Sequence, residues 1–242
     1  MKITVIHGQG HKGSTYHITR QIIDNISDTE KEVFEYFMPL DTPDYCVGCY
    51  QCFDEGEETC SQADKVQKIV KAMEESNLII IDSPTYCLGM TGQLKTFFDH
   101  LGYMWLSHRP KKAMFNKIGI AVSTAAGSGS NKVTKDLARQ MFYLGIPKVY
   151  RYGKSVNAAN WESVPKKIKK SIARDIVKLS KKVEKKVWRI KPGIRLRLMF
   201  NIMRLMQKSN DWNLTDRDYW QEKGWLGKKR PWQNKKKQVK AL

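Results

Sequence analysis

Apolar residues in the first 155 positions of the chain follow two alternating periods. Five short apolar runs predict strands, at residues 3–8, 32–39, 77–84, 117–124 and 148–153. Between them, apolar residues recur at every third or fourth position, which predicts helices over residues 14–26, 63–73, 92–105 and 131–145. This alternation predicts an α/β fold with a doubly wound, five-stranded parallel sheet. Ligands of such sheets bind outside the carboxyl ends of the strands, so the loops there are the candidate site.

The pattern changes after residue 157. A long amphipathic helix is predicted over residues 163–190 and a second, Met-rich helix over 194–208. Neither helix can bury its apolar stripe alone, so both must dock on the preceding domain, on a twin subunit or on a membrane surface. Four tryptophans follow, and we favour an arm that embraces a second subunit; they are Trp212, Trp220, Trp225 and Trp232. The predicted division is a first domain at 1–157, a helical, Trp-rich extension at 158–232 and a disordered basic tail at 233–242.

Charge is concentrated in this C-terminal part. The chain has a formal net charge of +19, and the residues from 151 onward hold 27 Lys and Arg against 7 Asp and Glu. This asymmetry is typical of a segment with an anionic partner, such as an acidic protein, a nucleic acid or a membrane surface. Helical periodicity favours the simpler interpretation that lysines coat the solvent face of helices, and we expect no nucleic-acid partner.

Neither a transmembrane segment nor a signal peptide is predicted. No run of about 18 apolar residues occurs. The N-terminus is a short strand pattern that meets glycine at once, without the longer apolar region of a signal peptide. We therefore expect a cytoplasmic location, where cysteines are more often thiols or metal ligands than structural disulfides.

The loop at residues 7–15, "HGQGHKGST", follows the first predicted strand and leads into a helix. Its glycines permit tight turns, and the free backbone N–H groups at a helix N-terminus suit a phosphate. Lys12, Ser14 and Thr15 can add side-chain contacts to such an anion, and His11 is a further candidate. The pattern is neither a Walker motif nor G-x-G-x-x-G, so an ordinary glycine turn is the alternative.

Two further loops carry a more specific pattern. "SPTYCLGMTGQLKTFFDHLGYMW" (83–105) joins a strand, Ser-Pro, an aromatic residue and glycine to a helix, and "STAAGSGSN" (123–131) is a glycine-rich turn. In order and spacing, the three loops resemble the flavodoxin-like superfamily of NAD(P)H-dependent FMN reductases and quinone reductases, over roughly residues 1–155. The resemblance implies a flavodoxin-like FMN-binding domain, followed here by the basic helical extension.

The resemblance also implies where FMN binds. The phosphate is expected at residues 9–15, and the flavin ring is expected against residues 83–90 and the 123–127 turn. The residues expected to contact the cofactor are Gln9, His11, Lys12, Ser14, Thr15, Ser83, Pro84, Thr85, Tyr86, Cys87, Leu88, Gly89, Met90, Ser123, Thr124, Ala125, Ala126 and Gly127. No side chain is assigned a catalytic role, because the flavin performs the redox chemistry.

Four of the five cysteines lie in "CVGCYQCFDEGEETC" (46–60). The superfamily has an iron–sulfur flavoprotein branch with a compact cysteine motif, and the resemblance to it implies that Cys46, Cys49, Cys52 and Cys60 could hold a [4Fe–4S] cluster. Cluster-free relatives carry a similar loop, and the long last gap resembles theirs, which leaves free or redox-active thiols as an alternative. Zinc is a third possibility, although the tight spacing fits tetrahedral geometry poorly. We therefore assign no metal site from the sequence.

Three functions follow from these features. The leading hypothesis is an FMN-dependent oxidoreductase, with NAD(P)H as a transient donor and a quinone, nitroaromatic, flavin or protein as acceptor. The alternative is an iron–sulfur flavoprotein that transfers electrons to or from a ferredoxin-like partner, with the basic extension docking an acidic redox protein. A third hypothesis makes the extension a binding arm for membrane or nucleic acid. We favour a structural role for the extension in a homodimer or higher homo-oligomer.

Overall fold

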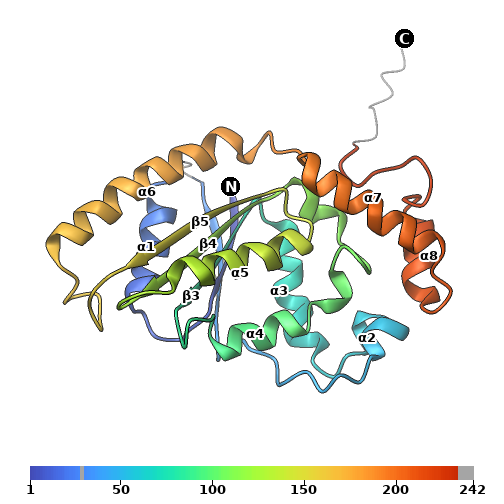
Figure 1. Ribbon diagram of the computed structural model, residues 1–242, viewed down its shortest axis with the longest axis horizontal. Helices are drawn as coiled ribbons and strands as arrows, with labels where there is room; N and C mark the ends of the chain where they lie inside the picture. Colours follow the sequence, from blue (N-terminus) through green and yellow to red (C-terminus); the bar gives the residue numbers. More distant parts are fainter. Residues whose placement is uncertain (28–29, 234–242) are drawn as a thin grey trace, which may run out of the picture.

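The computed structural model describes residues 1–27 and 30–233. Its centre is one parallel sheet in the order β2-β1-β3-β4-β5 (Figure 1). The strands are β1 (Lys2–His7), β2 (Glu32–Phe37), β3 (Leu78–Pro84), β4 (Ile118–Ala125) and β5 (Lys148–Ser155). All pairings are parallel, which confirms the predicted fold. Strand order reverses between β1 and β3, the place where sheets of this kind bind ligands.

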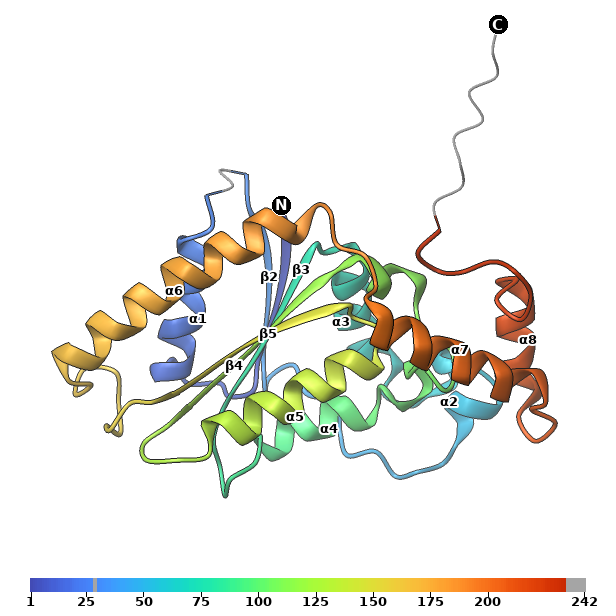
Figure 2. The same ribbon diagram turned by 45° about the horizontal axis from the view of Figure 1, so that its top comes forward.

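Helices cover both faces of the sheet (Figure 2). One face carries α3 (Ala63–Glu75), α4 (Gly92–Asp99) and α5 (Ser130–Tyr143), and the other carries α1 (Ser14–Asp24) and α6 (Lys166–Val187). Side chains alternate along each strand, so Ile80 packs towards α1 and α6 while Ile79 and Ile81 pack on the opposite face. The strands read as continuous apolar runs because both faces are covered.

Helix α6 belongs to this layered core. Its buried residues Ile172, Ile176 and Val183 join the cluster formed by α1 and the sheet. The predicted division at residue 157 therefore falls between β5 and a helix that packs on the same sheet. Lysines occupy the outer face of α6, as the helical periodicity indicated.

The rest of the extension packs against the far end of the domain. Helices α7 (Ile194–Lys208) and α8 (Leu214–Glu222) form a separate apolar cluster around Phe200 with Leu106 and Phe115. Trp220 and Trp225 are buried there and Trp232 is partly buried, whereas Trp212 is 76% exposed. Three of the four tryptophans thus pack within their own chain. The predicted disordered tail lies, from residue 234 onward, outside the described residues.

The structure differs from the sequence-based elements mainly near the cysteines. The helix predicted over 92–105 ends at Asp99 and continues as a short 3-10 turn at Gly102–Met104. A single helical turn that was not predicted, α2 (Gln51–Asp54), lies inside residues 46–60, which we call the cysteine segment. Among the described residues, no helix is both long and apolar enough to cross a membrane.

Candidate functional site

A cavity of about 410 Å³ opens at the carboxyl ends of the strands. Four loops contribute to it, after β1, β3, β4 and β5. Its lining consists of His11, Lys12, Gly13, Ser14, Thr15, Pro84, Thr85, Tyr86, Thr124, Ala125, Ala126, Val156, Ala158, Ala159, Asn160, Trp161 and Glu162. The three predicted loops are thus brought together at one place.

The first turn of α1 faces this cavity with free backbone donors. Gly13 precedes the helix in an extended conformation, and no side chain caps the N-terminus. The first backbone bond of the helix is donated by His17 to the Gly13 carbonyl at 3.1 Å. The N–H groups of Ser14, Thr15 and Tyr16 therefore precede it, and no acidic residue lies in that turn. Together with Lys12 they form a site suited to a phosphate.

The loop after β1 is tied closely to β3. Gly8 donates its N–H to the Asp82 carbonyl at 2.7 Å, and a Cβ at Gly8 would lie 2.8 Å from that oxygen. Only glycine fits such an approach. Thr91 donates its hydroxyl to the Gly8 carbonyl at 2.6 Å, which links the β1 loop to the start of α4. These contacts hold residues 8–13, the proposed phosphate loop, beside the 84–91 loop.

The segment after β3 forms a tight reversal. Tyr86 and Gly89 exchange two backbone hydrogen bonds, of 3.0 and 2.9 Å, around Cys87 and Leu88. Both central residues have left-handed backbones, with φ of 50° and 61°. Non-glycine residues at such φ values carry strain that is common at ligand sites. The Tyr86 hydroxyl accepts a hydrogen bond from Gln9 at 3.1 Å, so this turn also contacts the phosphate loop.

Sequence reasoning missed the loop after β5. Backbone bonds from Val156 to Ala125 and from Asn157 to Ala126 join it to the predicted β4 turn. Trp161 stacks on His17 at 5.2 Å between ring centroids and forms part of the cavity wall. The signal was available, because the same rule about strand ends applies to β5 as to the other strands.

The predicted cofactor residues divide into two groups. Ten of them line the cavity: His11, Lys12, Ser14, Thr15, Pro84, Thr85, Tyr86, Thr124, Ala125 and Ala126. The rest lie in the same loops outside that lining: Gln9, Ser83, Cys87, Leu88, Gly89, Met90, Ser123 and Gly127. Ser83 and Ser123 are fully buried, and their hydroxyls bond to the Thr91 N–H and the Thr85 hydroxyl. Contact of all these residues with FMN stays a prediction.

A buried charged group lies directly beneath the phosphate loop. His7 Nδ1 is 2.7 Å from Asp82 Oδ2, and His7 Nε2 is 3.2 Å from Glu35 Oε1. Thr19 donates its hydroxyl to the same Asp82 oxygen at 2.7 Å. Burial, the largest influence, lowers the pKa of His7, but the two carboxylates together outweigh it, so the pKa is raised above its ordinary value. The group fixes the end of β1, from which the phosphate loop departs.

The four clustered cysteines line a second cavity, of about 320 Å³, beyond the far end of α4. Cys60 Sγ lies 3.8 Å from His100 Nδ1, and His100 Nε2 lies 2.7 Å from the Asp44 carbonyl oxygen, so both ends of the segment meet this histidine. Burial raises the pKa of the Cys52 thiol to about 11, and the other three cysteines add to the shift. None of the five cysteines forms a disulfide.

The donor set of this cavity fits an iron–sulfur cluster better than a single ion. Among the residues that the structure describes, no three His, Cys, Asp or Glu side chains come close enough to hold one metal ion, so the arrangement does not support zinc. A [4Fe–4S] cluster is a larger body, and its four thiolates stand around it rather than meeting at a point. Four cysteines line this one cavity, which is the number of ligands that such a cluster takes: Cys46, Cys49, Cys52 and Cys60.

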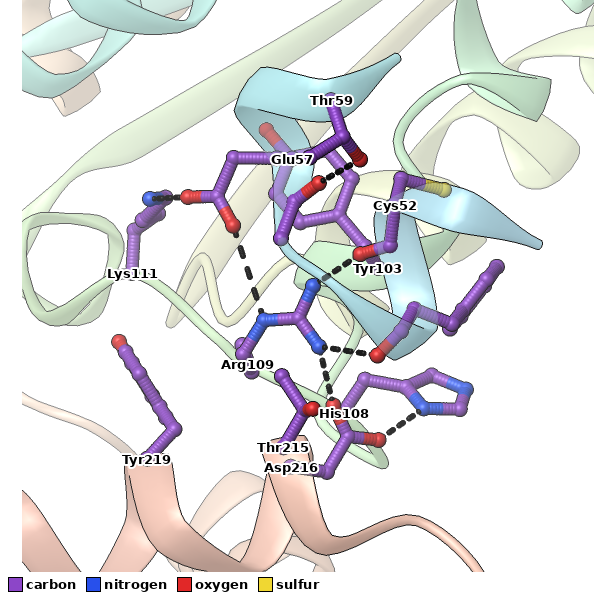
Figure 3. A network of polar contacts seen from close by, with 12 residues as sticks. Cys52, Glu57, Thr59, Tyr103, His108, Arg109, Lys111, Thr215, Asp216 and Tyr219 are labelled. Atoms are coloured by element: carbon purple, nitrogen blue, oxygen red, sulfur yellow. Dashed lines mark hydrogen bonds and ion pairs between the residues drawn. The ribbon is translucent and has the colours of Figure 1, made fainter.

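Arg109 joins the cysteine segment to the C-terminal extension (Figure 3). Its guanidinium donates to the carbonyl oxygens of Cys52 and Phe53 and lies 2.6 Å from Asp216 Oδ1. The other oxygen of Asp216 is 2.6 Å from His108 Nδ1. No pattern in the sequence pointed to this group, since Arg109 lies 57 positions from Cys52 and 107 positions from Asp216.

Comparison with known proteins places the chain among flavoproteins. A model of the family described as NADPH-dependent FMN reductase matches residues 1–160. An iron-sulfur flavoprotein of Archaeoglobus fulgidus is 26% identical over 233 residues, covering 93% of this chain and 100% of the relative. Another iron-sulfur flavoprotein, of Methanocaldococcus jannaschii, is 31% identical over 150 residues, covering 60% of this chain and 72% of the relative.

Solved structures show the same fold. An azoreductase from Bacillus anthracis superposes with a TM-score of 0.59 at 14% identity, covering 75% of this chain and 99% of that one. FerB, a flavoenzyme NAD(P)H:(acceptor) oxidoreductase from Paracoccus denitrificans, superposes with a TM-score of 0.54 at 15% identity, covering 76% and 97%. At these identities the likeness concerns the fold alone.

Proposed function

The chain belongs to the family of NADPH-dependent FMN reductases, and from that premise we propose that it is an FMN-dependent oxidoreductase that draws electrons from NAD(P)H and delivers them to a separate acceptor. The observation that carries the proposal is the cavity at the strand ends, where the uncapped start of α1 meets the 84–91 loop. Bound FMN supplies the redox chemistry, and the protein binds and orients it.

Each loop has a task in this proposal. The N–H groups of Ser14 and Thr15 and the Lys12 ammonium hold the phosphate. Backbone groups of the 84–90 segment and of the 124–127 turn hold the polar edge of the ring. Tyr86 is 45% exposed beside the cavity, so its ring is available to the flavin. A quinone, nitroaromatic, flavin or protein remains the proposed class of acceptor.

The test is a titration of the apoprotein with FMN, followed by anaerobic addition of NADPH or NADH. Quenching of FMN fluorescence reports binding, and bleaching of the yellow colour reports reduction. Riboflavin serves as the matched ligand without phosphate. It should bind more weakly because it lacks the group that contacts the N-terminus of α1. A protein that takes up no FMN would overturn the proposal.

A second candidate function adds a [4Fe–4S] cluster, which makes the chain an iron–sulfur flavoprotein that exchanges electrons with a ferredoxin-like partner. Four cysteines around one cavity favour it, as do the names of the two relatives described above. Iron and sulfide counts after anaerobic reconstitution test it, with Cys60→Ser expected to lose iron. Cys87→Ser is the matched control, because Cys87 lies in the 84–91 loop and outside the cysteine cavity. Equal iron in both variants would contradict this function.

We also propose that the chain forms a homodimer or higher homo-oligomer through α7. One face of this helix buries Leu196 and Phe200, while a second apolar face is exposed and consists of Ile194, Leu198, Ile202, Leu205 and Met206. Exposed apolar faces of this extent commonly mark interfaces. Leu198→Glu should lower the mass measured by light scattering, whereas Val177→Glu, at an exposed position of α6, should leave it unchanged.

A further inference from the structure

The short helix α2 ends with three carbonyl groups that its own backbone does not satisfy. A helix of four residues cannot pair its last carbonyls internally. Arg109 donates to the Cys52 oxygen and, at 3.1 Å, to the Phe53 oxygen. Thr215 donates its hydroxyl to the Asp54 oxygen at 2.6 Å. Every one of these carbonyls is therefore bonded from outside the cysteine segment.

Most of these donors are supplied or held by the start of α8. Asn213 caps α8 by accepting from the Asp216 N–H at 2.9 Å, and its side-chain amide also donates to the Phe53 oxygen at 3.3 Å. The Asp216 carboxylate is fully buried between Arg109 and His108. A buried guanidinium needs carboxylate partners, and Arg109 has two: Asp216 from α8, and Glu57 from the cysteine segment, whose Oε2 lies 3.6 Å from Arg109 Nε (Figure 3).

Helix α8 is itself fixed to the body of the protein. The indole N–H of Trp220 donates to the His108 carbonyl, and the Tyr219 hydroxyl donates to the Pro110 carbonyl at 2.8 Å. Trp220 is fully buried in the cluster around Phe200. The helix thus lies against residues 108–110 on one side and against α2 on the other.

Apolar burial holds the cysteine segment only in part. Cys52 and Phe53 pack against the core cluster, and Glu57 pairs with Lys111. Helix α2 buries none of its residues, and Tyr45, Val47 and Tyr50 are each more than half exposed. Segments with few buried apolar contacts open locally at low free-energy cost. The hydrogen bonds from Arg109 and α8 are therefore the contacts that fix the backbone carbonyls of α2, in addition to the packing of Cys52 and Phe53 on the core.

We propose that the C-terminal helix α8 is a clamp on the cysteine segment, and that Arg109, Asn213, Thr215 and Asp216 are positioning residues that hold Cys52 at its cavity. The extension is then part of the cysteine site. Where it concerns an iron–sulfur cluster, this proposal rests on the second candidate function. The restraint on the position of Cys52 is expected in the protein without iron as well.

The test compares full-length Asp216→Asn and Thr215→Val with the control Asp211→Asn. Asp211 is 87% exposed near the start of α8 and pairs with Arg217, so its substitution makes the same chemical change away from α2. Two measurements are made on the FMN-loaded protein without iron: hydrogen exchange by mass spectrometry and the alkylation rate of each cysteine with iodoacetamide. Cys87, exposed in the 84–91 loop, is the internal reference.

The clamp predicts a local effect. Alkylation of Cys52 should accelerate about tenfold in Asp216→Asn and about fivefold in Thr215→Val, the losses expected for a charged and a neutral hydrogen bond. Exchange over residues 46–60 and 214–222 should accelerate together, with FMN content and the Cys87 rate unchanged. If Asp216→Asn accelerates exchange throughout the domain, the clamp is judged from the exchange and alkylation rates of Thr215→Val.

Two results would overturn the clamp. One is exchange that accelerates in α8 while residues 46–60 keep the rate of the control. The other is no change in either segment in both variants. Iron uptake is measured last, in the same proteins. If the wild-type protein takes up no iron, the iron–sulfur function is contradicted. The clamp is still tested by hydrogen exchange and alkylation, so the two failures are distinguishable.

Discussion

The hydroxyl of Thr15 lies 2.6 Å from the hydroxyl of Thr124, although 109 positions separate them in the sequence. Both residues are almost fully buried at the edge of the strand-end cavity. Thr15 belongs to the first turn of α1, and Thr124 lies near the end of β4. The pair fixes the proposed phosphate site relative to the proposed ring site, which implies that it positions both parts of the cofactor together.

Thr124→Val should therefore weaken FMN and riboflavin binding by similar factors, about tenfold, because a buried Thr15 hydroxyl left without its partner costs about 1–3 kcal/mol. Fluorescence titration with each ligand measures this. Thr4→Val is the control, since Thr4 forms a comparable buried pair with Ser76 near the opposite ends of the strands. Equal ligand affinities in wild type and Thr124→Val would argue against the positioning role.

Lys12→Ala should act on the phosphate alone. Lys12 lies in the loop before α1 and lines the cavity, so its loss should weaken FMN binding about tenfold, as expected for one charge-assisted contact. Riboflavin binding should not change, and the difference between the ligands should shrink at high salt. Lys71→Ala, at an exposed position of α3, is the control. A matching loss for riboflavin would show that Lys12 does not contact the phosphate.

The buried His7 group predicts a dependence of stability on pH. Because the folded-state pKa of His7 is raised, its contribution is fully present below the unfolded pKa of about 6.5 and is lost as the pH rises through the folded value. The unfolding free energy in urea should fall over this window by about 1.4 kcal/mol for each unit by which the pKa is raised.

His7→Gln should flatten this slope, whereas His17→Gln, whose ring stacks on Trp161, should keep it. The groups that set the slope are Asp82 and Glu35 on the two ring nitrogens, with Arg20 paired to Glu35 at 3.4 Å. A His7→Gln protein with the wild-type slope would assign the effect to another group.

Phe200→Ala should destabilise the extension strongly. Phe200 is fully buried among Phe115, Trp220 and Trp225, and truncating such a side chain costs about 3–5 kcal/mol. Leu198→Ala on the same helix removes a side chain that is 61% exposed and should cost far less in the monomer. Urea unfolding followed by tryptophan fluorescence measures both. Similar losses for the two variants would mean that the Phe200 cluster does not hold the extension.

Much of the fold could be predicted because the information is local. Strands such as β3 and β4 read as continuous apolar runs, and helix faces such as that of α3 read as a period of three to four. The prediction that this helix reaches residue 105 was wrong. The chain turns into 3-10 geometry at Gly102, where Phe53 of the distant cysteine segment packs 3.1 Å from the position of a Cβ.

The site could be predicted only in part. The loops after β1, β3 and β4 carry glycine and proline patterns, whereas Trp161 and Asn160 stand in a loop without such a pattern and were missed. The contacts of the cysteines depend on tertiary structure: Cys60 meets His100, and Arg109 meets Asp216, across 40 and 107 positions. No single-sequence pattern encodes pairs at such separations.

The hydrogen bond between Asn213 and Phe53 can form only late in synthesis of the chain. Asn213 bonds to the Phe53 carbonyl across 160 positions, so the cysteine segment leaves the ribosome long before its partner is synthesised. At ordinary elongation rates, the interval is on the order of 10 s. During that time the thiols are accessible to oxidants and to any iron–sulfur donor. The cysteine segment therefore gains its contact with Asn213 only after the start of α8 has been made.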